Sequence, residues 1–315
     1  MVYIGIDIGG TNLKAGVVDG EGKILYTKKI PLGSWQSGDY FLDQLCTLAE
    51  DAAKEAGFDK SEVASVGMGF PGAVNDETGV LTYITNIPVS GYPLREKFQQ
   101  RWNVPVHLGN DANCAALGEY YAGAGRGSRS LVVVTLGTGV GGGIVLDGKI
   151  LAGCNGTGGE VGHIVIVPGG DQCNCGRKGC WERYASATAL KRMTVEAMHA
   201  HPESLMWELT GGDAAKAEGY TPFDAARKGD AAGAEVCNAY IEYVALGAAN
   251  LVNIFQPEVL AFGGGVSAQE DLMEPLAKRI AEEDFARNAG VSSVKVTRCS
   301  LGNDAGIIGA ALLGR

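Results

Sequence analysis

The stretch Val2-Tyr3-Ile4-Gly5-Ile6-Asp7-Ile8-Gly9-Gly10-Thr11 is an apolar run that ends in an aspartate and a glycine-rich turn. A second apolar run at 15–18, a turn at 19–22 and a third short run at 23–25 follow it. Apolar runs separated by turn residues predict short strands joined by tight turns. The beginning of the chain therefore predicts a β-meander whose first turn is rich in glycine.

The same features return in the same order further along the chain. Gly10-Thr11, Asp19-Gly20 and Lys23-Ile24-Leu25 correspond to Gly137-Thr138, Asp147-Gly148 and Lys149-Ile150-Leu151, at offsets of 127, 128 and 126 residues. Coincidence among glycine-rich hairpins is one interpretation. Three ordered matches at nearly one offset favour a duplicated domain, whose two halves would face each other across a cleft.

Hydrophobic spacing predicts the remaining helices and strands. An amphipathic helix is expected at 40–56 and a long helix at 231–255, which Pro257 ends. Further strands are expected at 63–68, 104–108, 131–136, 259–262 and 294–299, and further helices near 270–285 and 304–313.

The composition limits the class of protein. The chain has 315 residues, of which 46% are hydrophobic and 20% are charged, and these values suit a globular protein with two domains. Its net charge of −10 argues against a nucleic-acid groove, because such a groove needs basic side chains. We find no targeting segment and no long apolar run, so we expect a cytoplasmic protein without a membrane span.

Three glycine-rich turns follow apolar runs, at Gly9-Gly10, at 137–143 and at 263–265. Glycine lets the backbone approach a ligand and point its amides at phosphate oxygens. One such turn is usually an ordinary hairpin, but three in one chain indicate a nucleoside triphosphate site. Asp7, beside the first turn, could hold Mg²⁺ or form an Asx-turn, and its spacing does not decide between these roles.

Asp111 lies in the segment Gly109-Asn110-Asp111-Ala112-Asn113, directly after a predicted strand. One role for it is that of a helix N-cap, which is the commoner use of such an aspartate. The other role is that of a general base, which accepts the proton of a sugar hydroxyl as it attacks phosphorus. The residue pattern leaves both roles open.

Cysteines and a histidine form the sharpest pattern in the chain. Cys173, Cys175 and Cys180 lie in the segment Cys-Asn-Cys-Gly-Arg-Lys-Gly-Cys, and His163 lies ten residues before the first of them. Three thiolates and one imidazole complete a tetrahedral zinc site. Because the protein would fill all four positions, the zinc would be structural. Unrelated core cysteines are the alternative, and this density of cysteines disfavours it.

Taken together, these motifs resemble the ROK family of bacterial sugar kinases and repressors over nearly the whole chain. Residues 7–11 and 136–139 look like the two phosphate motifs of that family. Residues 160–163 match its Glu-x-Gly-His sugar motif, and residues 173–182 match its zinc motif, Cys-x-Cys-Gly-x-x-Gly-Cys-x-Glu. Residues 263–267 resemble its segment near the adenosine.

The resemblance implies an α/β fold of the actin and hexokinase type, which is ribonuclease H-like, with duplicated domains around a central cleft. A smaller domain is expected at 1–115, completed by a C-terminal helix at about 301–315, and a larger domain with the zinc site at 116–300. The resemblance also implies an ATP-dependent hexokinase that favours glucose, with Mg²⁺ and structural Zn²⁺, and a homodimer.

The resemblance assigns roles to individual residues. Asp111 falls where the family keeps its catalytic base, and it would also contact the sugar. His163 would bind zinc through one ring nitrogen and a sugar hydroxyl through the other. The other sugar contacts would be Asn86, Asn110, Glu160 and Glu182, and the nucleotide contacts would be Asp7, Gly9, Gly10, Thr11, Lys14, Gly137, Thr138, Gly139, Gly264 and Gly265.

Several alternatives stay open or are disfavoured. A kinase for N-acetylmannosamine, N-acetylglucosamine, allose or fructose would carry the same motifs, and polyphosphate could replace ATP. A sugar-sensing repressor would carry a DNA-binding domain before the core, and we expect none because the first predicted strand starts at Val2. A zinc ribbon would need paired Cys-x-x-Cys knuckles, and a zinc hydrolase would need an open coordination position.

Overall fold

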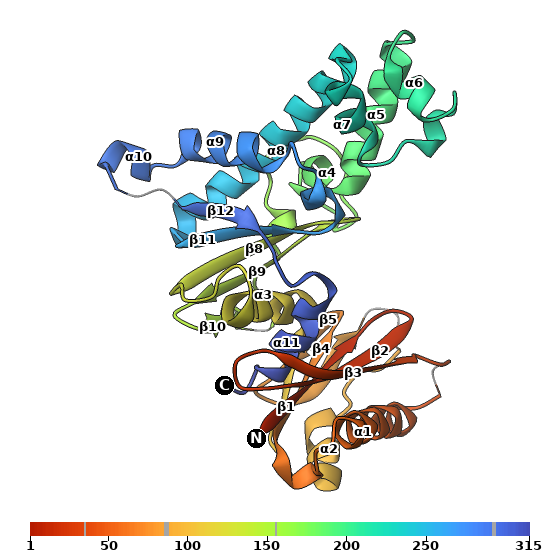
Figure 1. The fold of residues 1–315 in the computed structure, drawn as a ribbon, viewed down its shortest axis with the longest axis vertical. Coiled ribbons are helices and arrows are strands. Elements are labelled where there is room, and N and C mark those ends of the chain that lie inside the picture. The colour runs from red at the N-terminus through yellow and green to blue at the C-terminus, as the bar shows by residue number, and fades with distance from the viewer. Residues whose placement is uncertain (35, 85–87, 155, 292–293) are drawn as a thin grey trace. The chain divides into compact units, whose positions relative to one another are not determined.

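The structure is a computed structural model, and it describes residues 1–34, 36–84, 88–154, 156–291 and 294–315. The chain forms two compact units, and the ribbon of Figure 1 follows it through both. The first unit comprises Met1–Leu131, Gly143–Gly159 and Ser300–Arg315, and the second comprises Val132–Gly142 and Glu160–Cys299.

A five-stranded sheet forms the centre of the first unit. Its strands lie in the order β3-β2-β1-β4-β7. They are β1 (Val2–Ile8), β2 (Asn12–Val18), β3 (Ile24–Pro31), β4 (Val63–Phe70) and β7 (Val106–Asn110), and a separate hairpin of β5 (Gly72–Asn75) and β6 (Val80–Ile84) follows β4. The first three strands pair antiparallel, as the predicted meander requires, whereas β1, β4 and β7 run parallel.

Helices cover both faces of this sheet (Figure 1). On one face lie α1 (Gly38–Glu55) and α2 (Leu94–Trp102), and on the other lie α3 (Asp111–Ala122) and α11 (Ala305–Ala311). The buried side of α1 packs against the alternating isoleucines of β1, as its helical spacing predicted. On the opposite face α11 approaches so closely that a Cβ on Gly67 would overlap the carbonyl oxygen of Ala310.

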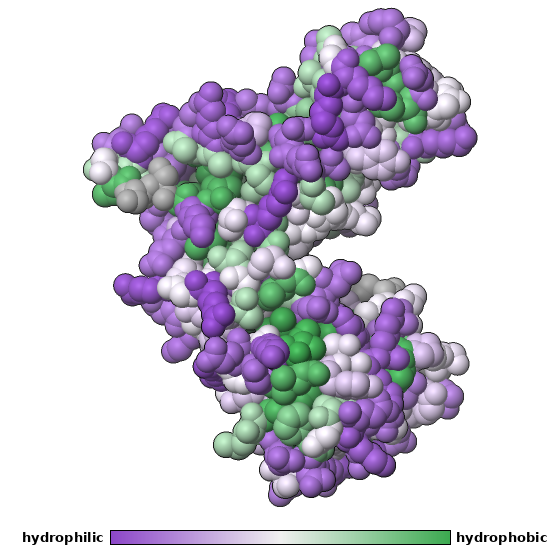
Figure 2. Space-filling view, viewed as in Figure 1, coloured by the Kyte–Doolittle hydropathy of each residue, from purple (hydrophilic) through white to green (hydrophobic). Residues whose placement is uncertain are grey.

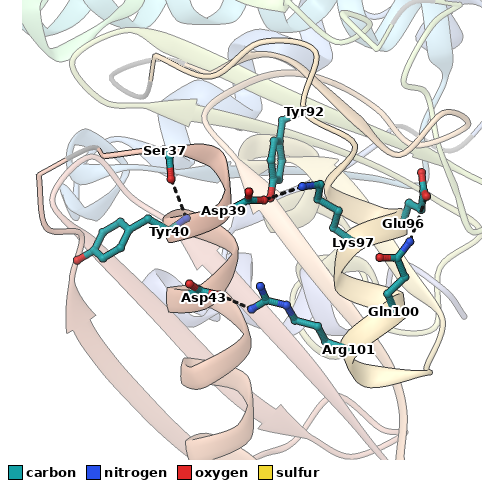
Figure 3. A network of polar contacts seen from close by, with 9 residues as sticks. All are labelled: Ser37, Asp39, Tyr40, Asp43, Tyr92, Glu96, Lys97, Gln100 and Arg101. Carbon is teal, nitrogen blue, oxygen red and sulfur yellow. Dashed lines mark hydrogen bonds and ion pairs between the residues drawn. The ribbon is translucent and has the colours of Figure 1, made fainter.

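A surface network of polar contacts joins α1 to α2 (Figure 3). Asp39 accepts hydrogen bonds from Lys97 Nζ and from Tyr92 OH, both at 2.6 Å. Arg101 pairs with Asp43, one turn further along α1. Exposed ion pairs each contribute about 0–1 kcal/mol, so the buried apolar contacts supply most of the stability of this helix pair.

The second five-stranded sheet repeats the strand order of the first. It runs β10-β9-β8-β11-β12. Its strands are β8 (Ser130–Leu136), β9 (Val140–Leu146), β10 (Lys149–Ile150), β11 (Val259–Gly263) and β12 (Lys295–Arg298). The matching orders confirm the predicted duplication. One detail of the prediction was wrong, because residues 141–143 belong to β9 and the second glycine turn is confined to 137–139.

Helices make up most of the second unit. They are α4 (Glu182–Ala185), α5 (Ala187–Ala200), α6 (Leu205–Leu209), α7 (Thr221–Arg227), α8 (Ala231–Phe255), α9 (Met273–Glu283) and α10 (Ala286–Ala289). The bounds predicted for the long helix at 231–255 are confirmed. Trp181 is fully buried against α8 and donates from Nε1 to Tyr243 O at 2.7 Å. None of the helices formed by the described residues has the length and apolarity that a bilayer crossing requires.

Candidate functional site

The first group of predicted site residues lies at one edge of the first sheet. In the register of the parallel strands, Asp7 on β1 lies beside Gly69 on β4, which lies beside Gly109 on β7. Asp111 follows two residues later, as the first residue of α3. The carboxyl ends of parallel strands are where α/β sheets bind ligands, so the fold brings both predicted aspartates to a typical ligand edge.

Asp7 sits in a partly buried position with a cation next to it. Lys14 is its partner in the β1–β2 register, and Lys14 Nζ pairs with Asp304 Oδ1 at 2.7 Å. Burial raises the pKa of the Asp7 carboxyl, and the nearby charge of Lys14 opposes that rise. Gly306 of α11 faces this carboxylate, and a Cβ there would lie at ordinary contact distance from it.

The two residues at the start of α3 have different local roles. Asn110 is the N-cap, and its Oδ1 accepts from Ala112 N at 2.9 Å and from Asn113 N at 3.2 Å. Its Nδ2 donates to Gly72 O at 3.1 Å, and no other described residue accepts from it, so its second amide hydrogen can serve a ligand. The cap is therefore Asn110, and the N-cap alternative for Asp111 was wrong. Asp111 is the first residue of α3, at the positive end of the helix dipole.

The second group of site residues lies in the second unit. Residues 137–139 form a closed turn between β8 and β9, with Gly137 N donating to Gly139 O at 3.0 Å. Gly264 has a φ of +84°, and a Cβ there would overlap the backbone of Leu136. The predicted adenosine segment thus packs against the strand that carries the phosphate turn, and both predicted nucleotide elements of this unit lie together.

The Glu-x-Gly-His motif forms one turn of 3₁₀ helix, η2 (Val161–His163), with Glu160 as its N-cap. His163 N donates to Glu160 O at 3.1 Å. The Glu160 side chain is exposed, whereas His163 is half-buried and turns its ring toward the cysteines. This short turn therefore fixes the spacing between the predicted sugar carboxylate and the predicted zinc imidazole.

The four predicted zinc ligands come together. Their ligand atoms all lie within 4.8 Å of one another. Cys173 Sγ is 3.7 Å from His163 Nδ1, and Cys175 Sγ is 3.5 Å from Cys180 Sγ. A tetrahedral zinc with bonds of about 2.3 Å to sulfur and 2.0 Å to nitrogen spaces its ligands by about 3.5–3.8 Å. The residues thus fit the ion, and Nδ1 of His163 is the nitrogen that would bind it.

The buried thiol of Cys180 would have to lose its proton to bind the ion. Burial raises the pKa of the Cys180 thiol to about 12, so at neutral pH that thiol alone would stay protonated. Zinc binds the thiolate and removes this proton. With Nδ1 on the metal, the ring hydrogen of His163 would lie on Nε2.

Glu182, the last residue of the zinc motif, has a contact that the sequence did not suggest. Its Oε2 accepts from Val140 N at 3.1 Å, directly after the phosphate turn. Its Oε1 lies 4.0 Å from Cys173 Sγ. The residue predicted to contact the sugar therefore also touches the phosphate turn. Asn86, another predicted sugar contact, lies outside the described residues.

Two further residues were missed by sequence reasoning. Asp304 pairs with Lys14, but it lies 290 positions away along the chain and no local pattern connects the two. Glu119 is fully buried on α3 and accepts from Ser300 N and Leu301 N. A carboxylate inside an otherwise apolar helix pattern is a recognisable signal, because such a group is buried only when it is paired.

Comparison with known proteins finds relatives along the whole chain. A sequence profile described as "ROK family" matches residues 3–315. The glucokinase of Halalkalibacterium halodurans is 37% identical over 99% of this chain and 94% of that protein. The glucokinase of Thermotoga maritima is 39% identical over 98% of this chain and 95% of that protein.

A solved structure gives the same result in three dimensions. A ROK family glucokinase from Streptomyces griseus, in complex with glucose and AMPPNP, is 38% identical, covers 99% of both chains and matches with a TM-score of 0.75. With the duplicated sheets, this similarity confirms the predicted actin- and hexokinase-like fold. Since the profile and the relatives align from one end of the sequence to the other, the chain belongs to the ROK family.

Proposed function

We propose that this protein transfers the γ-phosphoryl group of ATP to the 6-hydroxyl of a free hexose, with glucose as the preferred sugar. The observation that carries the proposal is the end-to-end similarity to glucokinases, in a chain that keeps both phosphate turns, the sugar motif and the Cys₃His cluster. Each of these features supplies one part of the reaction.

Each unit carries side chains that we assign to the sugar. They are Asn110 and Asp111 in the first unit, and Glu160, His163 and Glu182 in the second. Carboxylates accept hydrogen bonds from sugar hydroxyls, whereas the free Asn110 amide hydrogen and His163 Nε2–H donate to them. A set with both donors and acceptors discriminates among sugars, because a missing hydroxyl leaves one of these groups unpaired.

Asp111 is the general base of the proposed reaction. Its carboxylate accepts the proton of the 6-hydroxyl while that oxygen attacks the γ-phosphorus in line. The charge that develops on the phosphoryl oxygens is met by backbone amides of the turns at Gly9-Gly10 and 137–139. Thr11 and Thr138 add hydroxyl donors, and Gly264 and Gly265 border the adenosine.

Asp7 and Lys14 complete the phosphate side of the site. We assign Lys14 to the phosphates of ATP and Asp7 to the cation that accompanies them. Mg²⁺, when bound, neutralises phosphate charge and aligns the β- and γ-oxygens. The partly buried Asp7 carboxylate fits this role, because a nearby cation offsets the cost of keeping it ionised.

The variant Asp111→Asn tests the proposal, because it removes the base and keeps the shape of the side chain. We expect kcat to fall by about 10²- to 10⁴-fold, which is the usual contribution of a general base, while the affinity for glucose changes little. ADP release in a coupled assay gives the rate, and calorimetric titration with glucose gives the affinity. Near-normal turnover would remove Asp111 from the mechanism.

A different sugar is the second candidate for the same chemistry. The residues that read the hydroxyls are shared by kinases for other hexoses and for N-acetylhexosamines, so the motif alone does not name the epimer. Parallel assays with glucose, allose, fructose, N-acetylglucosamine and N-acetylmannosamine distinguish them. A kcat/KM for any of these sugars above that for glucose would change the assignment.

We further propose a homodimer in the cytoplasm. Apolar side chains gather on the surface over α10 (Figure 2), and directly before and after that helix Phe285 and Val291 are 72% and 58% exposed. Such a patch favours self-association, and a sedimentation measurement on Phe285→Glu tests it.

ATP and reduced zinc-binding thiols both favour the cytoplasm. The domain boundaries near residues 115 and 300 stay part of the proposal.

A further inference from the structure

The second phosphate turn rests on a short segment that directly follows the zinc cluster. Residues 182–188, which we call the support segment, contain the end of the zinc motif, α4 and the start of α5. Three hydrogen bonds join this segment to the turn. Val140 N donates to Glu182 Oε2 at 3.1 Å, Ala187 N donates to Gly137 O at 2.7 Å, and Thr188 Oγ1 donates to Thr138 O at 2.8 Å.

These bonds determine where the amides of the turn point. In a trans peptide, the carbonyl of one residue and the N–H of the next lie in one plane and point in opposite directions. The carbonyls of Gly137 and Thr138 both face the support segment. The N–H groups of Thr138 and Gly139 therefore point away from it, side by side. Two adjacent amides aimed the same way form an anion-binding site.

The contact between the turn and Glu182 leaves no room for a side chain. A Cβ on Gly139 would overlap Glu182 Oε2. A side chain at 139 would therefore have to displace this carboxylate from Val140 N. Next to this contact, a Cβ on Gly162 of the sugar motif would overlap the carbonyl oxygen of Val140. The end of the turn is thus held between the sugar motif on one side and Glu182 on the other.

The zinc cluster fixes the position of Glu182. Cys180, a zinc ligand, is followed by Trp181, and Trp181 N donates to Ile164 O at 2.8 Å, next to the ligand His163. The Trp181 ring is fully buried. Cys180 in the zinc cluster and the buried Trp181 therefore fix the backbone directly before Glu182. Loss of either point would let the carboxylate move away from Val140 N.

We infer that Glu182 is a positioning residue for the second phosphate turn, so that zinc and the support segment hold the ATP site as well as the sugar site. This inference rests on the proposed function, because it takes residues 137–139 to bind nucleotide phosphate. It gives Glu182 one oxygen for the turn and one for the sugar. Loss of zinc should then weaken the binding of ATP and the binding of the sugar together.

Direct binding of the Mg²⁺ complex of AMPPNP, measured by calorimetry without sugar, tests the inference apart from turnover. For Glu182→Ala we expect the dissociation constant to rise about tenfold, which is the usual effect of losing one charge-assisted bond. Glu182→Gln should recover part of this affinity, because its amide oxygen can still accept from Val140 N. Thr188→Val should also lower the affinity for AMPPNP, and it should leave the affinity for glucose unchanged.

Glu160→Gln is the matched comparison, because Glu160 belongs to the sugar motif and, in the part of the chain that the structure describes, forms no hydrogen bond with residues 137–140. We expect this variant to bind glucose more weakly and to keep its AMPPNP affinity within about twofold of the wild type, since no phosphate contact is lost. Removing zinc from the wild type should lower its affinity for AMPPNP. Removing zinc from Glu182→Ala should lower the affinity little further, because both changes take away the same carboxylate contact.

The outcomes separate the inference from the proposed function. If Glu182→Ala binds AMPPNP like the wild type and loses only glucose, Glu182 is a sugar residue alone and the inference is wrong. If all variants bind AMPPNP as expected but no hexose is phosphorylated, the positioning role stands and the kinase assignment fails. Should Glu182→Ala not fold, Glu182→Gln and Thr188→Val decide, and wild-type affinity in both would overturn the inference.

Discussion

Glu119 gives the most direct test of how the first unit is held together. This side chain is fully buried on α3, eight residues after Asp111. Its carboxylate accepts from Ser300 N at 2.9 Å, Leu301 N at 2.8 Å and Ala124 N at 2.8 Å. It thereby fixes the backbone where the chain returns from the second unit to the first.

The effect of Glu119→Ala can be estimated from these contacts. Hydrogen bonds to a charged group contribute about 1.5–3 kcal/mol each, and water entering the cavity would restore part of that. We therefore expect the variant to lose about 3–5 kcal/mol, most of the stability of a marginal unit. At about 2–4 °C per kcal/mol for a protein of this size, the melting temperature should fall by roughly 6–20 °C.

Thermal melting followed by circular dichroism measures this loss. Glu21→Ala is the control, because the Glu21 carboxylate is also paired, with Arg126, but its side chain is 78% exposed. That variant should change stability by less than about 0.5 kcal/mol. A melting temperature for Glu119→Ala within about 2 °C of the wild type would refute the reasoning from buried hydrogen bonds.

The remaining predictions concern the titration of Asp7 and the reactivity of the thiols. Burial raises the pKa of Asp7 above 3.8, so the native state binds this proton more tightly than the unfolded state, and the contribution of Asp7 to stability is lost as pH rises through its raised pKa. Asp7→Asn should therefore melt at or above the wild-type melting temperature at pH 7, and this difference should disappear as pH is lowered to 3.8. Its kinase activity should fall by at least about tenfold. A melting temperature below that of the wild type at pH 7 would contradict this reasoning. In the zinc-loaded protein, an exposed-thiol reagent should modify Cys154 but not Cys175, although both are exposed, and chelation should make Cys175 reactive. Cys114 is buried, and burial raises its pKa well above the ordinary value, so this thiol should react only after unfolding. Peptide mass spectrometry measures the labelling of each cysteine. Equal labelling of Cys175 with and without chelator would argue against the zinc site.

The fold was largely predictable from local patterns. The meander at 2–25 and its copy at 131–151 appear as β1–β3 and β8–β10, because turn residues and apolar runs determine hairpins over short distances. The long helix at 231–255 was also predicted correctly, since a strong cap at Asp230 and a proline at 257 define its ends. The strand nature of 141–143 was missed because three glycines imitate a turn, whereas pairing in the sheet overrides that preference.

The site was predictable where a motif is continuous in sequence. Cys173, Cys175, Cys180 and His163 converge as their spacing predicted. Contacts that join distant segments left no such signal, among them Lys14 with Asp304 and Glu182 with Val140 N. These contacts depend on how the elements pack, which spacing along the chain does not encode.

The measurement that tests the central claim most directly is a coupled ADP-release assay with Mg-ATP and a panel of hexoses and N-acetylhexosamines, before and after zinc chelation. Our account predicts turnover with the highest kcat/KM for glucose, and loss of that turnover on chelation with recovery when zinc is returned. No turnover with any sugar, in protein shown to be folded and to contain zinc, would contradict the assignment of a hexose kinase.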